Sequence, residues 1–289
     1  MKPYQKILEQ QEKGHFFVIQ HIWGQSDSGV YNELVDVWNE KAGIDDNIFI
    51  LSKKYFGLRS VVKTLKKMGV IFEIVGKGED ETRLIKITKD NNRKLEPIIF
   101  DNFINFKFAG LEYKVDAGQA IFSRNKLDEG TEFLLKTALE HVGDLNGKAI
   151  GDLGGGWGAI SLILGTTFPQ SQIIAFENEF SSIKAFSKNV EDLHNITLFN
   201  SDIASLTDEN IQKYYNKLDY IISNPPLHVT TKQREDICQN MGKFIKKGGE
   251  IFVVTEGRFI SMYEKQLASI FKITGSFDYK RFRVFQCVK

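Results

Sequence analysis

The chain has 289 residues, with 38 Lys and Arg against 37 Asp and Glu, 42% hydrophobic residues and five prolines. This composition is typical of a globular protein of about two domains, and it excludes a long disordered region. The apolar stretches are strand-sized, far shorter than the ~20 residues that span a bilayer, and the N-terminal segment is too polar for a signal peptide. The two distant cysteines, Cys238 and Cys287, and the five histidines show no metal-ligand spacing. We therefore expect a reduced, cytoplasmic protein with no membrane segment and no metal site.

The near-zero net charge hides an asymmetry within the first hundred residues. Residues 1–50 carry four basic and eight acidic side chains, whereas 51–100 carry twelve basic and six acidic ones. One cluster, here called the basic face (53–67), contains six cations and no acid: Lys53, Lys54, Arg59, Lys63, Lys66 and Lys67. Such a cluster can neutralise RNA phosphates. It is equally expected of the solvated side of an amphipathic helix that buries Tyr55, Leu58, Val62 and Leu65.

The first hundred residues lack a glycine-rich turn but contain an internal similarity. IFILSKKYF at 48–56 matches IFVVTEGRF at 251–259 without a gap, and a helix and an apolar hairpin are expected after both. This favours a smaller α/β N-terminal domain over 1–98, a truncated and degenerate copy of the last elements of the chain. The alternative is a winged helix, with 51–69 as recognition helix and 70–88 as wing.

Strand-like and helix-like segments alternate from about residue 147 onward. The predicted strands are 148–153, 172–176, 196–199, 218–223 and 251–255, followed by a closing hairpin of 273–277 and 282–288. The predicted helices are 159–166, 181–194, 234–245 and 262–271, with a further helix between the third and fourth strands. This alternation predicts a doubly wound, mostly parallel sheet with an antiparallel last strand, in a Rossmann-like domain over 99–289.

A glycine-rich turn, DLGGGWG at 152–158, ends the first of these strands and starts a helix. Such a turn lets the backbone approach a ligand closely and offers free helix N–H groups, but by itself it also fits a dinucleotide-binding fold. Glu177 and Asp202 end the next two strands, where a carboxylate can accept ribose hydroxyls and an adenine amino group. Because parallel strand ends meet at one edge of a sheet, we expect these acids to converge on one crevice.

A second motif, SNPPLH at 223–228, follows the fourth strand. Prolines remove backbone donors and leave their carbonyls free, so the Asn224 side-chain oxygen and the Pro225 carbonyl can both accept from one substrate NH2 group. Holding both N–H bonds favours a pyramidal nitrogen whose lone pair is aimed at an electrophilic methyl. His228 borders this loop and is a candidate for substrate contact or proton acceptance.

Together, DLGGGWG, the strand-end acids and NPPL resemble the class I S-adenosylmethionine-dependent methyltransferases that act on planar amino groups. QAIFSRNKLDEGTEFLL at 119–135 and the segment after Lys246 resemble the ribosomal RNA guanine amino-methyltransferases, the group of ribosomal RNA small subunit methyltransferase C. The similarity extends over 100–289 and, loosely, over 47–90.

The resemblance implies S-adenosylmethionine as the cofactor and assigns roles to individual residues. Cofactor contacts are implied for Thr131, Asp152, Gly154, Gly156, Glu177, Asp202 and Asn224. The catalytic loop is implied to be Asn224, Pro225 and Pro226. Substrate contacts are implied for Phe122, Leu227, His228 and Phe259.

One departure from this family bears on the substrate. The residue after Asn-Pro-Pro is normally an aromatic that stacks on the target base, whereas here it is Leu227. Stacking is worth ~1–3 kcal/mol per base. The first hypothesis is therefore methylation of a guanine amine of ribosomal RNA, with the basic face holding RNA. The alternatives are an N-methyltransferase for a small metabolite or natural product, with the N-terminal domain as lid or dimer interface, and a non-enzymatic interaction module. The chain is expected to be a monomer or a homodimer.

Overall fold

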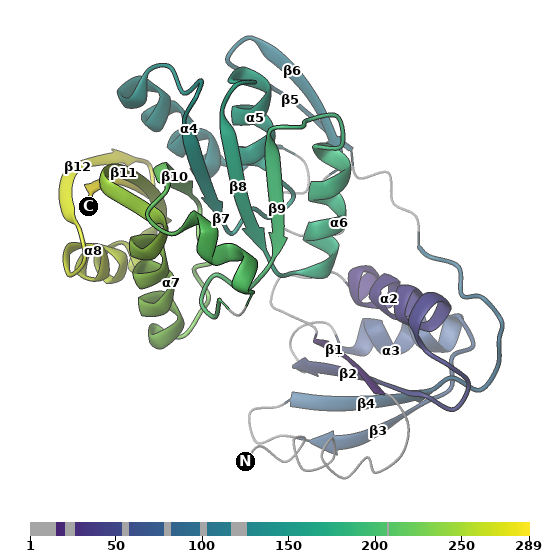
Figure 1. Cartoon of the computed structure of the whole chain (residues 1–289). Helices are drawn as coiled ribbons and strands as arrows, with labels where there is room; N and C mark the ends of the chain where they lie inside the picture. Colours follow the sequence, from purple (N-terminus) through teal and green to yellow (C-terminus); the bar gives the residue numbers. More distant parts are fainter. Residues whose placement is uncertain are drawn as a thin grey trace. The chain divides into compact units, whose positions relative to one another are not determined.

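The computed structural model describes residues 16–20, 27–53, 58–77, 82–98, 103–116, 126–206 and 208–289. The chain divides into two compact units (Figure 1). Unit 1 comprises residues 1–102 with 119–121, and unit 2 comprises 103–118 with 122–289. Phe122 and two cations of the basic face, Lys54 and the side chain of Lys53, lie outside the described residues.

Unit 2 is built on a seven-stranded sheet. Its strands are β7 (Ala149–Leu153), β8 (Gln172–Glu177), β9 (Ile196–Asn200), β10 (Leu218–Ser223), β11 (Ile245–Glu256), β12 (Lys272–Tyr279) and β13 (Phe282–Val288). Their order is β12-β13-β11-β10-β7-β8-β9. The strands from β7 to β11 pair in parallel, whereas β13 runs antiparallel between β11 and β12. The predicted Rossmann-like fold with an antiparallel last strand is confirmed.

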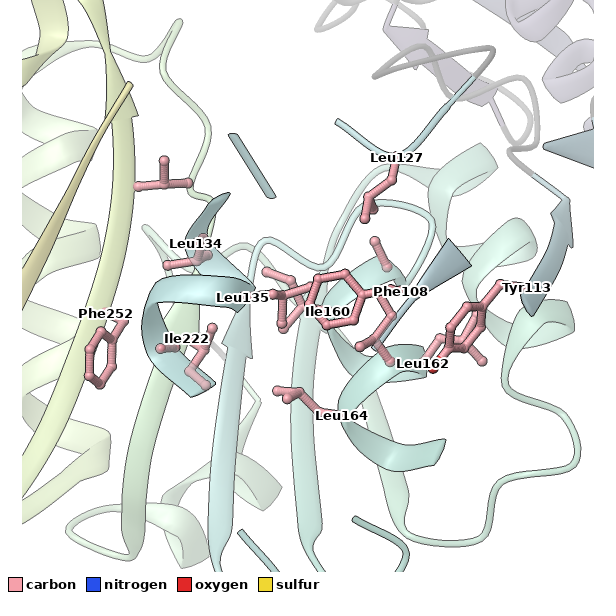
Figure 2. Close-up of a cluster of buried hydrophobic side chains, with 14 of the residues drawn as sticks. Phe108, Tyr113, Leu127, Leu134, Leu135, Ile160, Leu162, Leu164, Ile222 and Phe252 are labelled. Atoms are coloured by element: carbon pink, nitrogen blue, oxygen red, sulfur yellow. The ribbon is translucent and has the colours of Figure 1, made fainter. Parts of the chain in front are cut away.

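Helices cover both faces of this sheet, as Figure 1 shows. They are α4 (Glu129–Val142), α5 (Ala159–Thr167), α6 (Phe180–Asn189), α7 (Thr231–Phe244) and α8 (Ile260–Ala268), with short 3-10 turns η3 (Glu209–Tyr214) and η4 (Gly257–Phe259). Neighbouring strand residues point to opposite cores: Ile222 packs with α4 and α5, and Ile221 packs with α7 and α8. Burial on both faces explains why the strands are continuous apolar runs. Figure 2 shows the first core, where Leu134 and Leu135 of α4 lie near Ile222 and Phe252.

Several element boundaries differ from the predictions for physical reasons. Helix α6 ends at Asn189, before the expected 194, because Val190 already leaves the helical conformation with φ −115° and ψ 13°. Helix α7 starts at Thr231, earlier than expected, because Thr230 and Gln233 form a capping box. Strand β11 begins at Ile245, earlier than the expected 251, because Ile245 already pairs with Leu218 of β10, before a register shift. The helix expected between β9 and β10 is the 3-10 turn η3.

A hairpin that the sequence analysis did not identify accounts for Trp157 of the glycine-rich turn. Strands β5 (Phe103–Phe108) and β6 (Leu111–Asp116) form a two-stranded sheet. The Phe106 ring stacks on Tyr113 and meets the Trp157 ring edge-on, with centroids 6.1 Å apart. Asn189 Nδ2 donates to both the Asp116 and the Trp157 carbonyls, at 2.8 and 2.9 Å. Trp157 therefore anchors the hairpin to the domain.

Unit 1 contains a smaller mixed sheet with the order β1-β2-β4-β3. Its elements are β1 (Phe16–Gln20), α2 (Asp27–Asp36), the π-helical turn η1 (Val37–Lys41), β2 (Asn47–Lys53), α3 (Leu58–Lys67), β3 (Phe72–Lys77) and β4 (Thr82–Thr88). Strands β1 and β2 are parallel, and β4 runs antiparallel between β2 and β3. This is the arrangement of β10, β11, β13 and β12. In both hairpins the register shifts at a glycine, Gly76 or Gly275.

The topology of unit 1 differs from the winged-helix alternative. Strand β4 is an inner strand of the sheet, so the hairpin that it forms with β3 does not project as a wing. Helix α3 buries Leu58, Val61 and Leu65 in the core of unit 1.

In the part of the chain that the structure describes, no helix is both long and apolar enough to cross a membrane.

Truncation of a core residue of α4 tests the packing of unit 2. Leu134 is fully buried, so we expect Leu134→Ala to lower the free energy of unfolding by about 2–5 kcal/mol, through lost apolar burial and a residual cavity. Urea unfolding measures the loss. Glu140→Ala, at an exposed position of the same helix, is the matched control and should change stability by less than about 0.5 kcal/mol. Equal stability of the two variants would contradict this packing.

Candidate active site

The glycine-rich turn after β7 and the Asn-Pro-Pro loop after β10 lie against each other. Gly154 has φ +88°, and a Cβ built there would be 3.4 Å from the Pro226 ring and 3.8 Å from the Asn224 carbonyl oxygen. The same position is 3.8 Å from Ile203, in the loop after β9. Ser223 Oγ also donates to the Leu153 carbonyl at 2.6 Å and ties the two strand ends together. The ends of β7 and β10 and the loop after β9 thus meet in one region, and a crevice shared by the strand-end acids stays a prediction.

Asp152 connects β7 to the helix that follows the turn. It is fully buried, and its Oδ2 accepts hydrogen bonds from Ser161 Oγ at 2.7 Å and from the Ser161 N–H at 3.2 Å. Burial raises the pKa of this carboxyl to about 7. Its other oxygen, Oδ1, is buried and has no hydrogen-bond partner among the described residues. A buried oxygen without a partner, next to a glycine-rich turn, fits a site in which a bound cofactor donates a hydrogen bond to it.

Glu177 holds the same turn from the end of β8. Its Oε2 accepts from the Gly156 N–H at 2.8 Å, and its Oε1 accepts from the N–H groups of Asn178 and Glu179 at 2.9 and 2.8 Å. Burial raises the pKa of Glu177. A carboxylate has about four acceptor positions, so these three donors leave room for one more, such as a ribose hydroxyl. The turn-holding role was not anticipated from the sequence.

Asp202 lies in the loop after β9 and orders that loop. Its Oδ1 accepts from the Ala204 N–H at 2.8 Å, and the buried Asn240 Nδ2 donates to the neighbouring Ile203 carbonyl at 2.7 Å. Ile203 is the residue that reaches Gly154, so Asp202 belongs to a loop that borders the turn. Contact with an adenine amino group stays a prediction.

Asn224 meets the start of α4. Its Nδ2 donates to Thr131 Oγ1 at 2.9 Å and to Asp128 Oδ2 at 3.3 Å. Thr131 is therefore brought to the Asn-Pro-Pro loop, and its implied contact with the cofactor stays a prediction. Asp128 was not singled out by the sequence analysis. Its position before a helical segment signals an N-cap, but no local pattern signals its contact with Asn224.

The remaining predicted substrate residues border two cavities next to this loop. A cavity of about 300 Å³ is lined by His228, Glu256, Gly257, Arg258, Phe259 and Arg281. The rings of His228 and Phe259 meet edge-on with centroids 5.4 Å apart. Leu227 lines a smaller cavity of about 30 Å³ together with Asn224 and Asp128. Pro225 is buried, and the Pro226 carbonyl accepts from the Tyr263 hydroxyl at 3.3 Å.

Arginines add a cationic character that the sequence analysis missed. The Arg258 guanidinium lies 5.0 Å from the centre of the Phe259 ring, and that of the buried Arg234 lies 5.8 Å from it. Arg281 also lines the larger cavity, where its Nε pairs with Glu256 at 2.6 Å. These aromatic and guanidinium surfaces suit a planar, phosphate-bearing ligand.

The raised pKa of Asp152 gives a pH-dependent contribution to stability. Because the folded protein holds this proton up to about pH 7, whereas the ordinary pKa of an aspartate is 3.8, the contribution is complete below pH 4 and is lost as pH rises through 7. Relative to Asp152→Asn, wild type should lose about 1.4 kcal/mol of unfolding free energy per pH unit in this window. Urea unfolding between pH 4 and 8 measures it, with the exposed Asp192→Asn as control. Parallel pH profiles of wild type and Asp152→Asn would contradict the prediction.

Known proteins are similar to this chain in sequence and in fold. The ribosomal RNA small subunit methyltransferase C of Buchnera aphidicola subsp. Baizongia pistaciae is 31% identical over 216 residues, 72% of this chain and 61% of the relative. The protein of the same name from Buchnera aphidicola subsp. Schizaphis graminum is 26% identical, over 93% of this chain and 77% of the relative. The chain therefore spans less than two thirds of the first relative's length.

A solved structure and a family match extend the comparison. The 16S rRNA N2 methyltransferase of T. thermophilus, in complex with AdoMet and guanosine, has a TM-score of 0.69 at 20% identity. The match covers 95% of this chain and 72% of the T. thermophilus chain, and it shows a shared fold. Residues 112–286 match the methyltransferase small domain family, whose cofactor is S-adenosylmethionine. This match covers more than half of the chain, and the chain therefore belongs to the methyltransferase small domain family.

Proposed function

We propose that this protein is an S-adenosylmethionine-dependent N-methyltransferase whose acceptor is the exocyclic amine of a guanine in ribosomal RNA. The observation that supports the proposal most strongly is the orientation of the Asn224 side-chain amide. Its amide nitrogen is engaged by Thr131 and Asp128, so its carbonyl oxygen is the end left to accept a hydrogen bond from a substrate. The similarity to proteins named ribosomal RNA small subunit methyltransferase C supports ribosomal RNA as the substrate.

The cofactor role belongs to the turn and its neighbours. Asp152 and the backbone of Gly154 and Gly156 would hold the methionine part, and Glu177 and Asp202 the ribose and adenine. When bound, S-adenosylmethionine supplies an electrophilic methyl group. The buried, unpartnered Asp152 Oδ1 supports such a ligand, because a donor there removes an uncompensated polar group.

Asn224 and Pro225 act on the acceptor. A guanine amine is a weak nucleophile because its lone pair is delocalised into the ring. Asn224 Oδ1 and the Pro225 carbonyl oxygen each accept a hydrogen bond from one N–H group of the amine. These two hydrogen bonds favour a pyramidal nitrogen and stabilise the positive charge that develops on it during methyl transfer. The close contact between this loop and Gly154 supports the binding of the amine beside the cofactor turn.

The larger cavity offers a surface for the base in place of the missing aromatic residue. The Phe259 ring, with the Arg258 and buried Arg234 guanidinium groups 5.0 and 5.8 Å from its centre, supplies an aromatic and cationic surface beside His228. A nucleobase can stack on guanidinium as well as on an aromatic ring. This arrangement favours a nucleotide over an acceptor without phosphate.

Unit 1 supplies an RNA-binding surface in this proposal. On α3, Arg59, Lys63, Lys66 and Lys67 are exposed on the side opposite the buried Leu58, Val61 and Leu65. The order of its strands supports the interpretation of unit 1 as a truncated copy of the end of unit 2. We propose that this copy has kept the sheet and uses its basic face for phosphate contacts.

Label transfer tests the proposal. Tritiated S-adenosylmethionine is incubated with small ribosomal subunits that lack guanine N2 methylation, and cofactor binding is measured separately by calorimetry. We expect label in guanine of the RNA and none with Asn224→Ala, which should still bind cofactor because it keeps the turn. The exposed Asn210→Ala is the control and should keep full activity. Cofactor binding without RNA label would contradict the ribosomal acceptor and redirect the search to small molecules.

Charge reversal on α3 tests the basic face. We expect Lys63→Glu combined with Lys66→Glu to weaken RNA binding at least about tenfold and to lower the slope of log affinity against log salt by about 1.5, because two phosphate contacts are lost. Fluorescence anisotropy with ribosomal RNA fragments measures both quantities. Lys247→Glu combined with Lys272→Glu, at exposed positions of unit 2, is the matched control. Equal losses in both double variants would indicate a general charge effect and would contradict a specific role of α3.

A further inference from the structure

A single carboxylate oxygen organises the contact between Asn224 and helix α4. Asp128 Oδ2 accepts from the Thr131 N–H at 2.9 Å, from the Thr131 hydroxyl at 3.3 Å and from Asn224 Nδ2 at 3.3 Å. Thr131 Oγ1 in turn accepts from Asn224 Nδ2 at 2.9 Å. The amide nitrogen of Asn224 therefore has two acceptors, Thr131 Oγ1 and Asp128 Oδ2, and Asp128 also binds the first of them.

The orientation of the Asn224 carboxamide decides whether it can hold an amine. The two ends of a carboxamide have nearly the same shape, and a half-turn about the last side-chain bond exchanges oxygen for NH2. In one orientation the oxygen of Asn224 accepts a hydrogen bond from the substrate amine. In the other orientation the NH2 group of Asn224 faces the N–H groups of the amine, and no hydrogen bond can form. Only the hydrogen-bond partners of Asn224 determine which orientation is present.

Asp128 removes the unproductive orientation. An ionised carboxylate only accepts hydrogen bonds, so it pairs with the NH2 end of Asn224 and repels the oxygen end. The Thr131 hydroxyl by itself can donate or accept. Because Asp128 takes the hydroxyl hydrogen, Thr131 is left with lone pairs towards Asn224. We propose that Asp128 is the positioning residue of this site, which locks Asn224 with its carbonyl oxygen free for the acceptor amine. This inference rests on the function proposed above.

Local structure holds Asp128 in place for this role. It is the N-cap of α4, with φ −59° and ψ 133°. A Cβ at Gly130 would lie 3.0 Å from Asp128 Oδ2 and 2.9 Å from the Phe282 ring, so glycine leaves the space that the carboxylate occupies. Phe282, Asp128 and Asn224 line the same 30 Å³ cavity, which has room for about one or two water molecules and not for a base. The carboxylate is thus confined near Asn224.

The negative charge also strengthens the proposed clamp. Hydrogen bonds that share a group polarise one another, so N–H donation to a carboxylate increases the negative charge on the amide oxygen. That oxygen then stabilises more effectively the positive charge that develops on the nitrogen of the substrate.

Two substitutions separate positioning from helix capping. Ser is a good N-cap but is too short to reach Asn224, whereas Asn caps equally well and can place an oxygen where Asp128 Oδ2 lies. We expect Asp128→Ser to lower kcat for RNA methylation about a hundredfold, with KM for RNA, cofactor affinity and melting temperature nearly unchanged. Asp128→Asn should lower kcat far less. If Asp128 were only a cap, both variants would keep the wild-type kcat.

A spectroscopic measurement tests the same inference without the acceptor. The side-chain amide signals of Asn224, assigned by their loss in Asn224→Ala, are recorded in ¹H–¹⁵N spectra of the full-length protein. We expect slow solvent exchange of these protons in wild type and in Asp128→Asn, and fast exchange in Asp128→Ser. Unchanged signals in Asp128→Ser would overturn the positioning role. If the Asn224 amide protons exchange fast in Asp128→Ser but the wild-type protein labels no RNA, the positioning role is supported and the proposed substrate is refuted.

Discussion

The close approach of the glycine-rich turn to the Asn-Pro-Pro loop is the constraint on which the site depends. The turn and the loop follow β7 and β10, which are neighbours in the sheet although about seventy residues separate them in the chain. Parallel pairing brings their carboxyl ends to one edge, where Gly154 lies against Pro226 and Asn224. Gly154 has φ +88°, a conformation that residues with a side chain rarely adopt, so glycine is required for the turn to pass this close to the loop.

Buried or partly buried carboxylates build the site around this contact. Asp152 fixes the start of α5, Glu177 holds the turn through the Gly156 N–H, and Asp128 caps α4 while it engages Asn224. In each case acceptor oxygens meet donors at the start of a helix or turn, where backbone N–H groups lack partners within the helix. The polar groups are thus ordered before a ligand binds, which lowers the cost of reorganisation during a reaction.

The two units have the same strand arrangement but present different residues. Both have a parallel strand pair followed by a helix and an antiparallel hairpin inserted next to the second strand. The shared requirement is an apolar residue at every second position on one face of the sheet, as at Ile48 and Ile50 in unit 1 and at Ile251 and Val253 in unit 2. Unit 1 lacks a glycine-rich turn and instead carries exposed cations on α3.

By itself the sequence determined the strands of the seven-stranded sheet, the antiparallel last strand, helices α5 to α8 and the location of both motifs at strand ends. These features depend on periodicity, glycine and proline, which act over a few neighbouring residues. Only the tertiary structure decided that Asp128 meets Asn224, 96 residues away, that Trp157 anchors the β5–β6 hairpin, and that Arg234 and Arg258 flank Phe259. These contacts have no local signature, because they form only when packing brings distant elements together, and many different sequences satisfy the same local pattern.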